Sequence, residues 1–63
     1  MARMKTWKVT YERYNPQLGM HLHTREIEAA TARSAINKLN KRFEEAERRG
    51  AYGHNVAVSA ELA

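Results

Sequence analysis

The stretch TARSAINKLNKRFEEAERRG, residues 31–50, changes the hydrophobic period of the chain from two to that of an α-helix. Its apolar residues recur at the i, i+3, i+4 and i+7 spacing that places them along one side of a helix. This stripe consists of Ala32, Ala35, Ile36, Leu39, Phe43 and Ala46. The pattern predicts a helix from about Thr31 to Arg49 with one apolar face.

Both ends of this predicted helix carry boundary signals. Thr31 is a suitable N-cap, because its hydroxyl can accept a hydrogen bond from a free amide of the first turn. Gly50 is well placed to end the helix in the left-handed conformation that glycine adopts without strain. The last turns also contain i,i+4 pairs of glutamate and arginine in the favoured order, Glu44 with Arg48 and Glu45 with Arg49.

Alternating residues lie on either side of the helical stretch. The segment TWKVTYERY, residues 6–14, places Trp7, Val9 and Tyr11 on one face, which predicts a strand with Trp7 in the core. NPQLG, residues 15–19, has the composition of a hairpin loop. HNVAVSAEL, residues 54–62, alternates again and predicts a strand with one apolar face, made of Val56, Val58, Ala60 and Leu62.

The segment between the hairpin loop and the helix, MHLHTREIEA, has an inconsistent phase. Met20 and Leu22 share one parity, whereas Ile27 and Ala29 share the other. A regular strand cannot bury both pairs on one side of a sheet. We favour a β-bulge or strand break near residues 24–26, which would restore the phase. In the alternative, Met20 and Leu22 lie on the second face of the sheet.

The predicted order of elements is strand, strand, helix, strand, which is an α+β chain of ββαβ type. We predict a single small domain, residues 1–63, in which one helix packs on one face of a three-stranded sheet. The first two strands pair antiparallel, and the place of the last strand stays open. Such a sheet leaves one face and at least one edge uncovered, which favours docking of a partner or of a second copy in a homodimer.

Composition excludes several classes of protein. The chain has 63 residues, no cysteine and a formal charge of +4. The absence of cysteine excludes disulfides and thiolate zinc sites. No apolar run approaches the roughly 20 residues of a membrane-spanning helix, and no signal-peptide core follows the basic N-terminus. We therefore expect a soluble cytoplasmic domain without membrane association, which buries only about 60% of its unfolded surface.

The histidines are the candidates for metal ligands. His21 and His23 lie two apart on a predicted strand, so they point the same way. A zinc site needs three or four protein ligands, and the chain offers only His54 or a glutamate such as Glu26 besides, with no aspartate. We expect no metal site and no cofactor, and we interpret both histidines as partly exposed strand residues.

Catalytic motifs are also missing. Ser34 and Ser59 are the serines, and neither lies in a glycine-flanked nucleophile elbow. The glycines form no phosphate-binding loop. A chain of this length also lacks the wall of a deep pocket. We therefore expect a protein that is not an enzyme.

Two classes of binding function remain. In the first, the chain binds a protein through the open sheet face or edge, with Met20, His21, Leu22 and His23 as candidate contacts. In the second, it binds RNA or DNA through its basic residues, with stacking by Tyr14 and Tyr52. The candidate phosphate contacts are Arg3, Lys5, Lys8, Lys38, Lys41, Arg42, Arg48 and Arg49. We favour the protein partner, because glutamates are interspersed among the basic residues of the helix.

The layout TWKVTYERY, REIEAATARSAINKL, HNVAVSAEL resembles a recurring small ββαβ design. In this design a tryptophan-bearing strand pairs with a strand that ends in an I-x-A-x-T step, here Ile27, Ala29 and Thr31. It is similar to small podophage inhibitors of host RNA polymerase and to archaeal and eukaryotic ribosomal proteins of the LX type. The resemblance implies a stand-alone binding module, phage-encoded, that occupies a surface of host macromolecular machinery. The inhibitor family is acidic whereas this chain is basic, and no functional residue is transferred.

Overall fold

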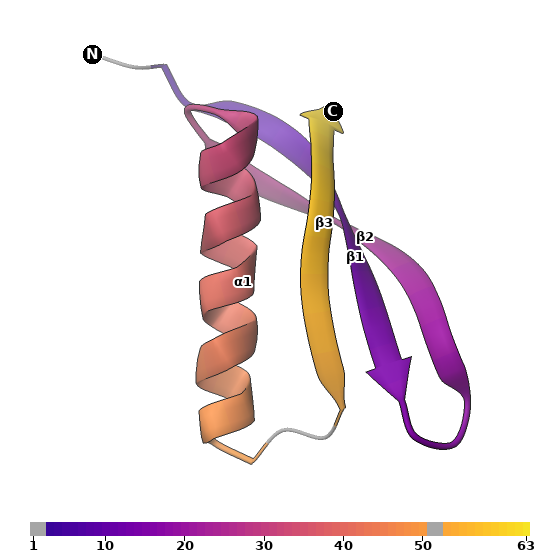
Figure 1. Cartoon of the computed structure of the whole chain (residues 1–63). Helices are drawn as coiled ribbons and strands as arrows, with labels where there is room; N and C mark the ends of the chain where they lie inside the picture. The colour runs from indigo at the N-terminus through magenta and orange to yellow at the C-terminus, as the bar shows by residue number, and fades with distance from the viewer. Residues whose placement is uncertain (1–2, 51–52) are drawn as a thin grey trace.

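The structure, a computed structural model that describes residues 3–50 and 53–63, is the predicted ββαβ fold of the α+β class (Figure 1). Tyr52, a predicted stacking residue, lies outside the described ranges. The elements in chain order are β1 (Lys5–Asn15), β2 (Gly19–Ala29), α1 (Ala32–Arg48) and β3 (His54–Leu62).

One antiparallel sheet with the order β2-β1-β3 contains all the strands. The closing strand therefore lies beside β1, which answers the question that the sequence left open. The hairpin between β1 and β2 turns where the Asn15 carboxamide oxygen accepts from the amides of Gln17 and Leu18, at 2.8 and 3.2 Å. Gly19 follows with a φ of 84°, a left-handed conformation that favours glycine.

The helix begins and ends as predicted. The Thr31 hydroxyl accepts from the Ser34 amide at 3.1 Å, and the helix stops before Gly50, whose φ is +87°. The predicted glutamate–arginine pairs near its end do not form ion pairs. Within the described ranges, the salt bridge is the one that joins the imidazole of His54 to the carboxylate of Glu47 at 2.6 Å.

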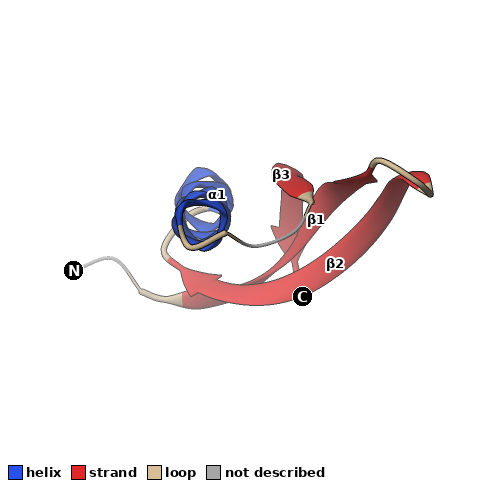
Figure 2. Cartoon of the chain, turned by 90° about the horizontal axis from the view of Figure 1, so that it is seen from below, coloured by secondary structure: helices blue, strands red, loops and turns tan. Residues whose placement is uncertain are grey.

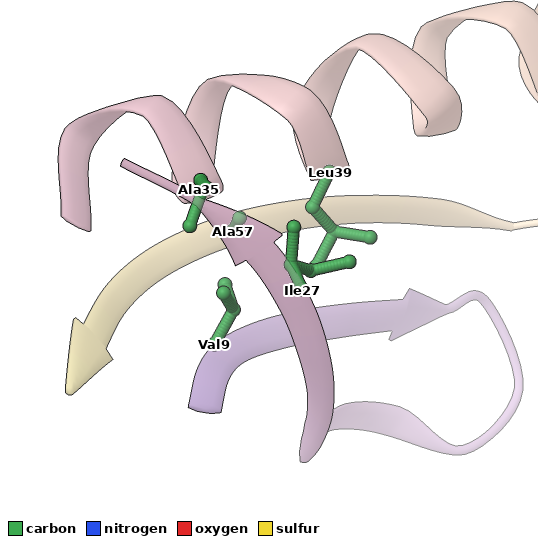
Figure 3. Packing of buried hydrophobic residues seen from close by; sticks show 6 residues of the cluster. Val9, Ile27, Ala35, Leu39 and Ala57 are labelled. Carbon is green, nitrogen blue, oxygen red and sulfur yellow. The ribbon is translucent and has the colours of Figure 1, made fainter. Parts of the chain in front are cut away.

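The core lies between the helix and one face of the sheet. Ala35 and Leu39 of α1 meet Val9, Ile27 and Ala57, one residue from each strand (Figure 3). Trp7, a predicted core residue, is partly buried against this cluster, and its indole N–H donates to the Ala29 carbonyl at 3.0 Å. Figure 2 shows the helix along one side of the strongly twisted sheet, so that the hairpin end projects past it. The molecule is accordingly elongated, measuring 43 × 22 × 13 Å.

The predicted irregularity in β2 is wrong. The register between β1 and β2 is continuous, from Lys5 opposite Ala29 to Asn15 opposite Gly19, without a bulge or break at residues 24–26. Met20 and Leu22 therefore lie on the sheet face that points away from the helix, which was the alternative. No bulge is needed, because the core takes only the end of β2 and leaves its hairpin half outside.

The bulge lies in β3 instead. Ser59 is opposite Thr10, but Ala57 is opposite the next residue, Tyr11, so that Val58 is the extra residue. The predicted common face of Val56, Val58, Ala60 and Leu62 is therefore broken. The phase shift turns both Ala57 and Ala60 towards the core, where small side chains let the helix lie close to the strand.

Candidate functional site

An apolar patch occupies the hairpin end of the open face, which is the sheet face that points away from the helix. Because Val9, Ile27 and Ala29 face the helix, even-numbered residues of β1 and β2 face away from it. We call this group the hairpin patch, and its members are Tyr14, Met20, Leu22 and Val56. Tyr14, Met20 and Leu22 have 42%, 47% and 62% of their surface exposed, whereas Val56 is half-buried.

Register brings these side chains together from three strands. Tyr14 lies directly opposite Met20, while Leu22 and Val56 lie on either side of Glu12 in the next row. Such cross-strand neighbours are close enough for their side chains to touch. The patch is therefore continuous over the open face, although its members are far apart in the sequence.

The open face also carries charged side chains, most of them towards the end of the sheet away from the hairpin. Of the charged side chains that register places on the open face, Lys8 is the base, and the acids are Glu12, Glu26, Glu28 and Glu61. These give a formal charge of −3, and since the whole chain is +4, the rest of the molecule carries +7. Lys8 lies opposite both Glu26 and Glu61, so its charge is offset by its neighbours. The open face is therefore acidic in a basic protein.

Glu12 and Tyr14 give the hairpin patch its polar groups. The Tyr14 hydroxyl donates to the Glu12 carboxylate at 2.8 Å. This hydrogen bond, with smaller contributions from desolvation and from the Glu12 charge, raises the pKa of Tyr14 above its usual 10. The His54 ring lies 6.1 Å from the Tyr14 ring, measured between centroids. The phenol is thus a neutral, oriented group beside an exposed apolar surface.

The predicted protein-binding residues do not form one site. His21 and His23 lie on the helix side of the sheet, opposite in direction to Met20 and Leu22. The His23 ring stacks on Tyr11 at 5.6 Å, and Tyr11 in turn meets Phe43 of the helix at 5.0 Å. A hollow of about 290 Å³ lies beyond the helix, lined by Arg13, Asn15, Leu18, His21 and His23.

The predicted phosphate contacts are dispersed. Lys38, Lys41 and Arg42 line a groove of about 650 Å³ between the helix and β2. The same groove is lined by Glu45, by Glu26 and Glu28 of the β2 edge, and by Met4 and Ile27, so that acidic residues lie among the basic ones. Register places Lys8 on the open face and Lys5 on the helix side, Arg3 precedes β1, and Arg48 and Arg49 are at the far helix end. No single basic surface contains them all.

Sequence reasoning missed Val56 and Glu12, and it named Tyr14 only as a stacking residue for nucleic acid. The sequence did contain a signal for this patch. Tyr14 is an aromatic residue among the otherwise polar even-numbered residues of β1, and Met20 and Leu22 are the even-numbered residues of β2 on the same face. Among the residues that the structure describes, no group of three or more side chains is arranged to hold a metal ion.

In comparisons with known proteins, no protein-family model, no curated protein and no solved structure matches this chain. In the described parts of the chain, the helix is too short and too polar to cross a lipid bilayer.

Proposed function

We propose that this chain is a small, non-enzymatic protein-binding module, encoded by a phage, which binds host macromolecular machinery and inhibits or modulates it through the open sheet face. The observation that carries the proposal is the hairpin patch, in which Tyr14, Met20 and Leu22 are exposed beside the half-buried Val56 on the open face of the sheet. Exposed apolar surface gathered in one place is characteristic of interaction sites. Tyrosine and methionine are also enriched in protein interfaces.

Charge defines the complementary surface of the partner. Glu12 lies within the hairpin patch, and Glu26, Glu28 and Glu61 make the part of the open face away from the hairpin acidic. A partner with apolar side chains at its centre and lysines or arginines at its rim would match both features. Rim charges of this kind mainly accelerate association, and their effect falls with salt.

The same charges disfavour nucleic acid on this face, because a formal charge of −3 repels phosphates. The alternative is an RNA- or DNA-binding domain that uses the helix face, and it draws support from the +7 charge outside the open face. The mixed lining of the helix groove argues against it, since Glu45 would lie beside any bound phosphate.

The decisive experiment measures binding to purified bacterial RNA polymerase and to a nuclease-treated bacterial lysate. The wild-type chain would be compared as bait with two double variants. The open-face variant carries Tyr14→Ser and Val56→Ser, and the helix variant carries Lys41→Gln and Arg42→Gln. We expect the open-face variant to bind the captured protein at least about tenfold more weakly, equivalent to about 1.4 kcal/mol. The helix variant should bind as the wild type does.

The nucleic-acid alternative predicts the reverse result. Capture would then be lost on nuclease treatment or in the helix variant, and affinity would fall steeply with the logarithm of salt concentration. Circular dichroism of each variant checks that the fold is retained. A homodimer is compatible with either function where it leaves the open face accessible.

A further inference from the structure

The two edges of the sheet differ in their availability to another strand. At the β3 edge, the side chain of Asn40 forms hydrogen bonds with both backbone polar groups of Ala57. Its carboxamide oxygen accepts from the Ala57 amide at 2.7 Å, and its NH₂ donates to the Ala57 carbonyl at 3.5 Å. The bulge at Val58 further interrupts this edge. A side chain across the edge and a bulge both prevent strand addition.

At the β2 edge, the backbone groups that point outward can be identified. The Ala63 amide donates to the Thr6 carbonyl, so the polar groups of Thr6 point to the β3 side and away from β2. Its partner Glu28 must therefore turn its own groups outward. In agreement, the Glu28 carbonyl accepts from the ammonium group of Lys38 at 2.8 Å.

In an antiparallel strand, the backbone N–H and C=O groups of every second residue point to the same side. Met20, Leu22 and Thr24 therefore also present their N–H and C=O groups to the outside of the sheet. No hydrogen bond from the described parts of the chain reaches these groups. The hairpin half of β2 is thus an unblocked edge, and its outward-bonding residues carry their side chains on the open face.

We propose that a second copy of this chain pairs with this β2 edge, antiparallel about a two-fold axis at Leu22, so that the two sheets join into one. Leu22 would lie opposite Leu22 of the second copy, and Met20 opposite Thr24. The paired segment would run from Gly19 to Arg25. The outward N–H and C=O groups would be satisfied, and the two hairpin patches would become continuous.

Other symmetric registers are less favourable. An axis at Arg25 would place two arginines directly opposite each other, which is destabilising. An axis at Thr24 would oppose Leu22 with Glu26 and would need the Glu28 carbonyl, which Lys38 already occupies. An axis at His23 would place Met20 opposite Glu26. The Leu22 axis leaves both glutamates outside the paired segment.

The second copy is the occupant that matches this edge best, because outward-bonding groups and exposed apolar side chains coincide on the same residues. Leu22, with 62% of its surface exposed, and Met20, with 47%, would both lose water on pairing. A charge of +4 on each copy opposes association, and salt screens it over about 8–10 Å. We therefore expect dimerisation to strengthen as the salt concentration rises.

Sedimentation equilibrium of the whole chain at tens to hundreds of micromolar tests the dimer. Leu22→Lys places a charge at the centre of the proposed contact and should raise the dimer dissociation constant at least tenfold. Val58→Lys is the matched control at the β3 edge and should leave it unchanged. Thr24→Pro removes one outward N–H without touching the bonds between β2 and β1, and it should also weaken the dimer.

Disulfide trapping gives an independent readout, because the natural chain has no cysteine. Leu22→Cys should form covalent dimers on mild oxidation, whereas Val58→Cys should not. The proposal is wrong if the wild type has the mass of one chain at every concentration and salt level. It is equally wrong if Leu22→Lys and Val58→Lys dimerise alike. Neither result bears on the proposed function, which is measured by partner binding of the Tyr14 and Val56 variant.

Discussion

The two faces of this sheet are made by the same three strands and have opposite properties. On the covered face, Val9, Ala29 and Ala57 have 0%, 0% and 5% of their surface exposed. On the open face, Met20 and Leu22 keep roughly half or more of theirs, at 47% and 62%. The difference shows that one helix supplies a core for only part of a long hairpin. The covered face should therefore determine stability, and the open face should contribute little to it.

The largest difference in stability should be between a leucine variant of the core and a leucine variant of the open face. Leu39→Ala removes a fully buried side chain of the helix, and we expect the free energy of unfolding to fall by about 2–5 kcal/mol. At about 0.05–0.15 kcal/mol per residue, a chain of 63 residues has a total stability of only about 3–9 kcal/mol, so the variant should lose a large share of it. Leu22→Ala should change stability by no more than about 0.5 kcal/mol.

Urea unfolding followed by Trp7 fluorescence measures both leucine variants. Similar losses for the two would contradict the assignment of Leu22 to an exposed face. They would instead indicate that the hairpin patch is covered in solution, as a tight dimer would require. Repeating the measurement over a range of protein concentrations separates these two explanations.

The second contrast compares the side chains that reach the two sheet edges. Asn40→Ala leaves the partly buried Ala57 amide without its partner, which should lower stability by about 1–3 kcal/mol. Lys38→Ala frees an exposed carbonyl of Glu28 that water can bond instead, and the cost should stay within about 0.5 kcal/mol. Thermal unfolding of both variants checks the order, and a larger effect at Lys38 would contradict it.

The third contrast concerns an aromatic residue from each face. Trp7→Phe keeps a ring against the core but removes the hydrogen bond to the Ala29 carbonyl, which should lower stability by about 0.5–1.5 kcal/mol before any loss of packing. Tyr14→Phe removes an exposed hydroxyl that bonds Glu12 and should leave stability almost unchanged. Urea midpoints followed by circular dichroism compare the two. Equal midpoints would show that the indole bond contributes nothing.

The smallest effect is a shift in titration on the open face. The Glu12 carboxylate raises the pKa of Tyr14 in the folded state. Any stabilisation from this bond is therefore complete below the unfolded value of about 10 and is lost as the pH rises through the higher folded value. Glu12→Gln should lower the pKa of Tyr14, as measured by ¹³C NMR of its ring. An unchanged titration curve would show that the two side chains are apart in solution.

The sequence by itself determined the elements of this protein. The apolar stripe with Thr31 and Gly50 at its ends specifies the helix, because helical period and capping are local properties. Alternation specifies the strands, and Asn15 with Gly19 specifies the hairpin turn. These signals need no knowledge of what lies across the fold.

Only the tertiary structure decided which face each residue occupies where the alternation was ambiguous. Met20 and Leu22 lie outside the core because the helix covers the other end of β2, a fact that no short stretch of sequence contains. The bulge belongs to β3 because Ala57 and Ala60 both pack on the core. Asn40 closes the β3 edge, although in the sequence it is only a polar residue beside the apolar stripe.

The division of charge was likewise decided by tertiary pairing. Glu12, Glu26, Glu28 and Glu61 are scattered among basic residues along the chain, and they gather on one surface only when β2 and β3 pair with β1. Cross-strand register joins residues that are distant in sequence, whereas the total charge of +4 only counts them. For this reason a basic chain has an acidic open face, which became visible only in the folded sheet.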